Sequence, residues 1–384
     1  MKGADVVFTY SYVSWQAAAE RGWFMPEDRL AKALVSHERV ERLLISDLMR
    51  SLPVKLLRDG VSALRSDRYP FPTSTSRQLL RPVRLRREYP TSIAGVRRAC
   101  AAYDRVLERR ARRMGMREPV LITANPLMAG FAEFAWAGSV TYFAHDDWLA
   151  YPLHERWWPA YEASFAQVRA RGRRVCAVSQ AALERIAPSG SSAVVPNGLD
   201  PTEWEGPAPP PPSWAPRARR PLLLYVGSLD SRLDVPALAR LARELPESEI
   251  ALVGPLLDDP HLAPLRGQAN VKIHPALARE QVAGLIRSAD VGLVPHVDSA
   301  LTRAMSPLKL YEYLAGGLPV VAGDLQPMRG VDPGVVLVEP GGDFAGGVRQ
   351  ALARGRASED ARRAFIAEHS WASRQETLLD LALA

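Results

Sequence analysis

The sequence predicts an α/β protein built from two doubly wound domains, and three observations support this. Short apolar stretches without polar alternation, typical of strands covered on both faces, alternate with helical stretches along the chain. The alternation occurs twice, and 384 residues are enough for two domains that each bury a core. Between the halves lies the most proline-rich stretch, "GPAPPPPSWAPRARR" at 206–220, which suits a stiff, extended linker. Each domain is therefore expected to be an open parallel sheet with helices on both faces.

The first domain is expected to span residues 1–205. Its predicted strands are 5–10, 40–46, 119–124, 139–144, 174–179 and 192–196, and its predicted helices are 25–35, 91–115, 153–171 and 180–187.

The second domain is expected to span residues 221–360. Its predicted strands are 221–227, 249–254, 270–274, 290–296, 318–323 and 334–340, and its predicted helices are 234–244, 278–287, 307–316 and 342–353. Residues 361–384 are predicted to form helices that can pack back on the first domain. If the two sheets face each other, the carboxyl ends of their strands surround a shared central cleft, where open α/β sheets usually bind ligands.

Composition excludes several classes of protein. No apolar run approaches the roughly 20 residues that a membrane span needs, and the amino-terminal residues lack the apolar segment of a secretory signal. The two cysteines, Cys100 and Cys176, form neither a disulfide framework nor a metal cluster. The expected location is therefore the cytoplasm.

Positive charge is concentrated in the first half of the chain. Residues 1–200 carry a net charge of +10 and the remainder −3. Between Arg65 and Arg117 there are fifteen arginines and only four acidic residues. An anionic membrane surface is one candidate partner for this region and nucleic acid is another. A solvated arginine-rich face without a partner explains the charge equally well. Because no nucleic-acid-binding motif accompanies the charge, the membrane ranks above nucleic acid, and no nucleic-acid partner is expected.

The stretch "SPLKLYEYLAGGLPVVAG" begins at Ser306. Ser306 is predicted to be the N-cap of a helix and Pro307 its first residue. Lys309 and Glu312 share a helix face and form either a surface ion pair or part of a ligand site. In the second case the helix N-terminus and Lys309 face an anion such as a diphosphate, and Glu312 accepts hydrogen bonds from hydroxyls such as those of a ribose.

Two further loops follow strands of the second domain. In "YVGSLDSRLD", Gly227 permits close backbone approach and Arg232 could reach a phosphate. In "NVKIHPAL", backbone groups beside His274 and Pro275 could bond a base edge. Each loop could equally be a plain turn, and neither carries the glycine fingerprint of a dinucleotide site.

The stretch "VTYFAHDDWLAYP" places three polar residues after a strand of the first domain. His145, Asp146 and Asp147 suit acceptor binding or proton handling, because loops at strand ends often carry function. An adjacent carboxylate pair supplies too few ligands for a metal. The structural alternative is an Asx turn with a capping aspartate. Asn197-Gly198 in "VVPNGLD" reads as a tight exit turn.

Taken in order, "CAVSQ", "VVPNGLD", "LLLYVGSLD", "IALVGP", "ADVGLVPH" and "SPLKLYEYLAGGLPVVAG" resemble the GT-B glycosyltransferases of the GT4-like group, close to teichuronic acid and exopolysaccharide transferases. The resemblance is clear over 174–340 and loose before it. There, the segments that contain Trp15 and His145 are similar to acceptor-side loops of the group.

The resemblance implies a donor site in the second domain. Glu312 would hold the ribose, Arg232 and the Gly227-Ser228 backbone would face the diphosphate, and the turn after His274 would read the base. The donor-binding residues implied are Gly227, Ser228, Arg232, His274, Pro275, Ser306, Pro307, Leu308, Lys309 and Glu312. The acceptor-binding residues implied are Trp15, His145, Asp146 and Asp147, and the catalytic ones His145, Arg232 and Lys309.

The sequence departs from the family pattern twice. The earlier of two glutamates seven residues apart is Ala304 here, which leaves Thr302, Arg303 or Ser306 to contact the sugar. A lysine that often follows the diphosphate arginine is absent from "RLDVPAL", and Lys309 would supply that charge.

The resemblance implies a retaining transfer from a nucleoside diphosphate sugar, with a UDP-sugar as first choice, to a small-molecule, lipid-linked or polysaccharide acceptor. Neither a metal nor a resident cofactor is expected, and the location is cytoplasmic or peripheral to the inner face of the membrane. The alternatives are a sugar-nucleotide epimerase of the same fold and a non-catalytic nucleotide-sugar-binding protein.

Overall fold

The computed structural model describes residues 3–59, 68–85, 88–150, 152–215 and 220–384. The chain forms two compact units. Unit 1 consists of Met1–Pro196 with Gln375–Ala384, and unit 2 is Asn197–Arg374. The chain thus passes between the units twice, and unit 2 is one continuous segment between two pieces of unit 1. None of the described helices is long and apolar enough to cross a membrane.

Unit 1 is built on a parallel sheet of seven strands in the order β4-β2-β1-β6-β7-β8-β9. The strands are β1 (Ala4–Thr9), β2 (Val40–Ser46), β4 (Arg77–Leu80), β6 (Val120–Thr123), β7 (Ser139–Ala144), β8 (Arg174–Ala177) and β9 (Ser192–Val194). The last four residues of both β1 and β2 are fully buried, as expected for strands covered on both faces. All six predicted strands are present, and the edge strand β4 was not predicted.

Helices connect the strands of unit 1. They are α1 (Trp15–Glu20), α2 (Pro26–Ser36), α3 (Leu52–Asp59), α4 (Ile93–Arg113), α5 (Pro126–Phe131), α6 (Trp158–Ala170), α7 (Gln180–Ile186) and the 3-10 helix η2 (Pro152–Trp157). In α4 the hydroxyl of Ser92 accepts a bond from the Gly95 amide at the N-terminus. Residues at helical spacing, among them Cys100, Tyr103 and Leu107, form its buried face, so most of its arginines lie on the opposite, exposed face.

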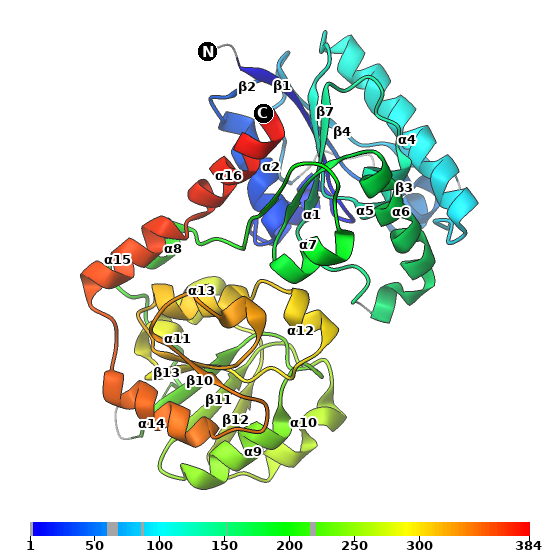
Figure 1. Cartoon of the computed structure of the whole chain (residues 1–384). Coiled ribbons are helices and arrows are strands. Elements are labelled where there is room, and N and C mark those ends of the chain that lie inside the picture. Colours follow the sequence, from blue (N-terminus) through cyan, green and yellow to red (C-terminus); the bar gives the residue numbers. More distant parts are fainter. Residues whose placement is uncertain (1–2, 60–67, 86–87, 151, 216–219) are drawn as a thin grey trace. The chain divides into compact units, whose positions relative to one another are not determined.

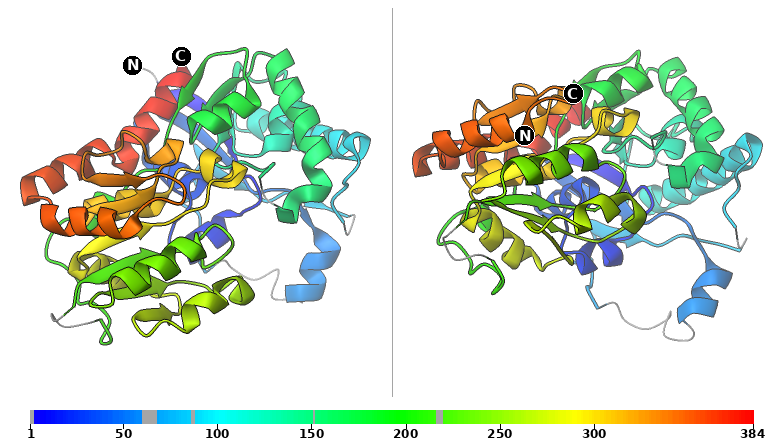
Figure 2. Two further views of the ribbon diagram at one scale, coloured as in Figure 1. Left: turned by 60° about the horizontal axis from the view of Figure 1, so that its bottom comes forward. Right: turned by 90° about the horizontal axis from the view of Figure 1, so that it is seen from below.

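A small parallel pair of strands lies apart from the main sheet of unit 1. β3 (Arg50–Ser51) pairs with β5 (Val83–Arg84), and α3 follows β3 directly. Figure 2 shows α3, in blue, at the periphery of the unit. None of these three elements was predicted from the sequence.

The last ten residues complete the core of unit 1. Helix α16 (Trp371–Leu383) inserts Leu378, Leu379 and Ala382 into the cluster that contains the buried side chains of β1 and β2. Arg39 forms an ion pair with Asp380 at 2.6 Å. Of the residues 361–384 that were predicted as one group, those from 375 onward belong to unit 1 and the rest to unit 2.

Unit 2 is a parallel sheet of six strands in the order β12-β11-β10-β13-β14-β15. The strands are β10 (Leu222–Val226), β11 (Glu249–Val253), β12 (Val271–His274), β13 (Val291–Val294), β14 (Val320–Gly323) and β15 (Val335–Val338). Hydrophobic clusters lie on both faces of the sheet, and all six strands were predicted.

The helices of unit 2 surround this sheet (Figure 1). They are α8 (Pro201–Trp204), α9 (Val235–Glu244), α10 (Asp259–Arg266), α11 (Arg279–Ser288), α12 (Ala300–Ala304), α13 (Leu308–Ala315), α14 (Phe344–Arg354), α15 (Glu359–Glu368) and the 3-10 helix η3 (Gln326–Met328).

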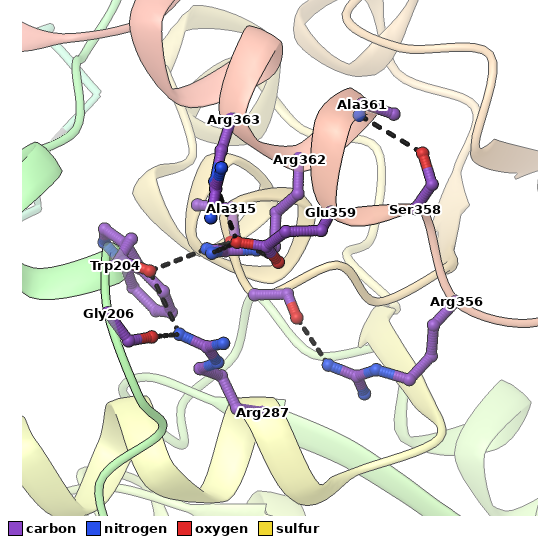
Figure 3. A network of polar contacts seen from close by, with 11 residues as sticks. Trp204, Gly206, Arg287, Ala315, Arg356, Ser358, Glu359, Ala361, Arg362 and Arg363 are labelled. Carbon is purple, nitrogen blue, oxygen red and sulfur yellow. Dashed lines mark hydrogen bonds and ion pairs between the residues drawn. The ribbon is translucent and has the colours of Figure 1, made fainter.

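The described part of the proline-rich stretch belongs to unit 2 and is not the connection between the units. Figure 3 shows how the segment before it is held in place. Arg287 donates to the carbonyls of Trp204 and Gly206, and Arg362 donates to the carbonyls of Trp204 and Ala315. The predicted position of the linker, 206–220, was therefore wrong: the chain enters unit 2 at Asn197, and Arg287 and Arg362 bind the segment at Trp204 and Gly206 to helices of unit 2.

Candidate active site

At the carboxyl edge of the unit 2 sheet, two of the predicted donor residues, Gly227 and Lys309, lie against each other. This glycine follows β10 with a φ of 148°, and a Cβ atom there would lie 2.9 Å from both Cε and Nζ of Lys309. Gly254, after β11, has a φ of 152° and would place a Cβ 2.0 Å from the Gly227 carbonyl oxygen. Two glycines are thus needed where the loops and the lysine approach one another.

Lys309 is a buried cation in the first turn of α13. Its Nζ lies 3.1 Å from the Tyr225 hydroxyl and 3.3 Å from Nε2 of His296, and 4.6 Å from the centre of the Tyr225 ring. No carboxylate of the described ranges forms an ion pair with it within 4.0 Å. Burial, reinforced by the charge of Arg232, lowers the pKa of Lys309 to about 7. A cation in this position is poorly compensated by the protein alone.

The two neighbours of the ammonium group are neutral. Burial and the nearby charges of Lys309 and Arg232 lower the pKa of His296 well below its usual value, so the imidazole is uncharged at pH 7. Burial raises the pKa of Tyr225, whose hydroxyl also donates to the carbonyl of Ser228 at 3.0 Å. Neither residue was predicted as part of the site, although His296 ends the "ADVGLVPH" segment.

Arg232 does not stand free, as the diphosphate role implied. Its guanidinium binds the carboxylate of Asp230, with Nη2–Oδ2 at 2.7 Å and Nε–Oδ1 at 2.9 Å. Burial raises the pKa of Asp230, but the hydrogen bonds and charge of Arg232 outweigh it, and the net shift is downward. The pair therefore brings little net charge, and of its two members Arg232 has the larger effect on the pKa of Lys309.

Glu312 is buried on the same helix as Lys309 but binds a different partner. Its Oε1 lies 2.6 Å from Nη1 of Arg279, and the same guanidinium binds Glu203 at 2.6 Å. Lys309 and Glu312 are 9% and 5% exposed. The surface ion pair proposed as an alternative is therefore wrong, because both side chains are buried and each contacts other residues.

The start of α13 also differs from the prediction. The helix begins at Leu308 with Pro307 in the capping position, and no side chain caps it. The Ser306 hydroxyl instead accepts a bond from the amide of Asn197 at 3.0 Å, and its carbonyl accepts one from Nδ2 of Asn197 at 2.6 Å. Ser306 thus anchors the first residue of unit 2.

The predicted base-reading turn is covered by an aromatic ring. The His274 imidazole stacks on the indole of Trp214, with ring centres 3.5 Å apart and planes at 8°. Burial lowers the pKa of His274, so the imidazole is neutral at pH 7. Pro275 follows directly at the end of β12.

The residues expected to replace the missing glutamate at Ala304 already have structural partners. The Thr302 hydroxyl donates to the Val297 carbonyl at 2.6 Å within the N-terminal cap of α12. Arg303 pairs with Asp298 on the surface. Ser306 is held by its bonds to Asn197, so all three residues already have structural partners.

In unit 1, His145 lies at the carboxyl end of β7. Its side chain is buried, and neither ring nitrogen has a hydrogen-bond partner among the described residues. Nε2 lies 3.7 Å from Oε1 of Glu27, and the ring meets Trp148 edge-on. Burial lowers the pKa of His145.

Glu27, in the first turn of α2, was not predicted as a site residue. Its carboxylate accepts bonds from the amide and the hydroxyl of Ser11, each at 2.8 Å. Burial nevertheless raises its pKa to about 7. At pH 7 a partly ionised carboxyl group and a neutral imidazole therefore lie side by side.

The other predicted acceptor residues have structural contacts. Asp147 binds Arg185 at 3.1 Å and caps the amide of Leu149, while Asp146 accepts a bond from the Asp147 amide. The local geometry is the turn that was considered as an alternative. Trp15 packs inside the core and is 4% exposed, so its ring is not a surface platform for a ligand.

Known proteins resemble this chain in sequence and in fold. Residues 220–354 match the family described as "Glycosyl transferases group 1". A stretch of 106 residues, 27% of this chain, is 29% identical to the Bacillus subtilis (strain 168) protein named as teichuronic acid biosynthesis glycosyltransferase TuaH. That stretch spans 27% of the length of TuaH.

Solved structures match nearly the whole chain. The apo form of the lipopolysaccharide outer core galactosyltransferase WaaB has a TM-score of 0.66 and 15% identity, covering 99% of both chains. A structure described as trehalose-6-phosphate from E. coli bound with UDP-2-fluoro glucose has a TM-score of 0.64 and 12% identity, with the same coverage. The predicted resemblance is confirmed: the chain has the GT-B fold, and its residues 220–354 form a glycosyl transferases group 1 domain.

Proposed function

We propose that this chain is a retaining glycosyltransferase that uses a nucleoside diphosphate sugar as donor. The observation that carries the proposal is Lys309, a buried ammonium group beside the backbone of Gly227 that forms no ion pair with any carboxylate in the described part of the chain. A charge removed from water is stable only when it is paired. A diphosphate bound at this edge of the sheet supplies the missing negative charge.

The rest of the nucleotide is assigned to residues on either side of Lys309. Glu312 keeps an oxygen for the ribose hydroxyls while Arg279 holds the carboxylate in place. The turn at His274 and Pro275 receives the base. The indole of Trp214 stacks on His274 at this turn, so the turn has room for a planar ring such as a base. Uridine is the first choice, supported by the UDP-2-fluoro glucose bound in the E. coli neighbour.

The chemistry breaks the bond between the anomeric carbon and the diphosphate oxygen and forms a bond from that carbon to an acceptor oxygen on the same face. Negative charge develops on the leaving diphosphate, and Lys309 and the N-terminus of α13 stabilise it. The acceptor proton passes to the leaving phosphate, so no enzymatic nucleophile is required. Retention follows from the family resemblance, as does the absence of a metal requirement.

Unit 1 is proposed to bind the acceptor, with His145 and Glu27 contacting hydroxyl groups. Glu27 can donate or accept a proton near pH 7, and the neutral imidazole of His145 can both donate and accept hydrogen bonds, which suits contacts that change during the reaction. The location proposed is cytoplasmic, peripheral to the inner face of the membrane, through the exposed arginines of α4.

The test is calorimetric binding of UDP, followed by incubation with a panel of UDP-sugars and detection of released UDP. Saturable binding and release that depends on an added acceptor are expected. A changed sugar nucleotide without a glycoside would identify an epimerase instead, and binding without any turnover would identify a non-catalytic binding protein. Full activity in EDTA is expected, and its loss would contradict the metal-independent proposal.

A further inference from the structure

Unit 1 contains a cavity whose lining includes none of the candidate site residues described above. Its volume is about 440 Å³, within the range of pockets that hold organic ligands. The walls come from segments that follow β1, β2 and β6 and from η2. They are mostly apolar and aromatic, with Tyr12, Leu48, Met49, Leu127 and Trp157 as examples.

The polar atoms of the aromatic wall are largely occupied. The Tyr12 hydroxyl lies 2.7 Å from the Tyr161 hydroxyl, which is also 2.9 Å from Nδ1 of His154. Trp157 donates its indole N–H to the carbonyl of Pro90 at 3.2 Å. Proteins recognise a sugar through hydrogen bonds to its many hydroxyl groups, and these side chains have few polar atoms left to form such bonds. The wall suits an apolar group better.

The charge at the cavity is positive. Arg50 of β3 and Arg84 of β5 both line it, and no aspartate or glutamate is among its described lining residues. The guanidinium of Arg50 makes no hydrogen bond or ion pair with any described residue. Arginine in the lining of an apolar cavity favours a phosphate.

Exposed apolar side chains surround the same elements. Nine large hydrophobic residues are exposed in the described chain, and four of them, Val54, Leu57, Val83 and Leu85, lie on α3 and at β5. Leu57 and Leu85 are 73% and 79% exposed. Leu57 belongs to α3, the helix at the periphery of unit 1 in Figure 2. Such a concentration marks a surface that meets another apolar phase.

We infer that this cavity binds a phosphate ester carrying an apolar chain, and that the ligand is presented by a membrane. Arg50 and Arg84 bind the phosphate, the aromatic wall receives the adjoining chain, and Leu57 and Leu85 enter the lipid surface. In the context of the proposed function, on which this assignment of role rests, the ligand is the lipid-borne acceptor.

The first experiment measures binding of dihexanoyl phosphatidic acid, a water-soluble phosphate ester, by calorimetry without nucleotide. Arg50→Ala and Val54→Asp, both in the lining of the cavity, are each expected to weaken binding tenfold or more. Arg243→Ala, at an exposed arginine on α9 of unit 2, is the control and should change affinity by less than about twofold. No saturable binding, or equal loss in the Arg243 variant, would overturn the inference.

Two further compounds test the contributions of the phosphate and of the apolar chain separately. Inorganic phosphate should bind at least tenfold more weakly than the ester, because it lacks the chain, and dihexanoyl phosphatidylcholine should also bind more weakly, because its head group is neutral overall. If either binds as tightly as phosphatidic acid, the corresponding part of the assignment is wrong.

The membrane source is tested with phosphatidylcholine vesicles that do or do not contain phosphatidic acid. Leu57→Asp should lower sedimentation with the acidic vesicles about tenfold while leaving binding of the soluble ester unchanged. Unchanged vesicle binding would refute presentation by a membrane. UDP affinity measured on the same samples distinguishes the two proposals: ester binding without UDP binding refutes the glycosyltransferase, and UDP binding without ester binding refutes only the cavity assignment.

Discussion

Replacing Lys309 by methionine should reduce the pH dependence of stability and weaken binding of UDP near neutral pH. Methionine keeps most of the length of the side chain and removes the charge. In the folded protein burial holds the pKa of Lys309 at about 7, whereas an unfolded lysine titrates near 10.4. Between these values the unfolded chain binds more protons than the folded one, so stability rises with pH in this range.

The size of the effect follows from the two pKa values. Below pH 7 both states are protonated and Lys309 carries its full desolvation cost. From pH 6 to pH 8 the folded state should gain about 1.4 kcal/mol from this residue. If the diphosphate binds only the ammonium form, the apparent Kd for UDP should rise roughly 15-fold from pH 7 to pH 8.5.

The assay is urea unfolding of wild type and Lys309→Met across this pH range, with calorimetry of UDP on the same preparations. Other titrating groups, Glu27 among them, are common to both proteins and cancel in the difference. The wild type minus variant difference should grow by about 1.4 kcal/mol from pH 6 to pH 8. A constant difference, together with a UDP affinity that does not change with pH, would refute the interpretation of Lys309 as an uncompensated buried cation.

Four other substitutions test the remaining contacts. Glu312→Ala should weaken UDP binding by about 1.5–3 kcal/mol by calorimetry, whereas Glu203→Ala, which also removes a partner of Arg279, should not; equal effects would leave only a structural role. Gly227→Ala should lower the free energy of unfolding by about 1–3 kcal/mol, because a side chain at a φ of 148° is strained and meets Lys309; an unchanged urea midpoint would argue against the close approach. His145→Ala should preserve UDP affinity and reduce transfer roughly 100-fold, and full activity would leave it a buried turn residue. Burial raises the pKa of Glu27 to about 7, so the free energy of unfolding of the wild type falls as the pH rises from about 4.5 to 7. By pH 8 the Glu27→Gln variant should therefore be more stable, relative to the wild type, by up to about 3 kcal/mol than it is at low pH. A difference between the two proteins that does not change with pH would contradict the raised pKa.

The sheets could be predicted from the sequence because buried parallel strands are continuous apolar runs. "PLLLYVG" and "DVGLVPH" become β10 and β13, which pair at the centre of unit 2. Strand β4 was missed because "RQLL" lies at a sheet edge and is only half buried. The β3–β5 pair is too short to leave a periodic pattern.

The candidate site could be predicted only in part. Glycines and charged residues at strand ends indicated Gly227, Lys309 and Glu312. Their partners could not be predicted, because an ion pair such as that between Arg279 and Glu312 joins residues 33 positions apart through the folded sheet. The sequence also suggested that Arg232 reaches a phosphate, and it did not show that the guanidinium is bound to the nearby Asp230.

The order of the chain in the two units has a consequence for synthesis on the ribosome. Unit 2 is continuous, so all of its strands and helices can assemble once Arg374 has left the exit tunnel. Unit 1 begins first but lacks Leu378, Leu379 and Ala382 until the last ten residues emerge. The nascent first 196 residues therefore expose an incomplete apolar core during the whole translation of unit 2, and this part of the protein has the greatest need of a chaperone.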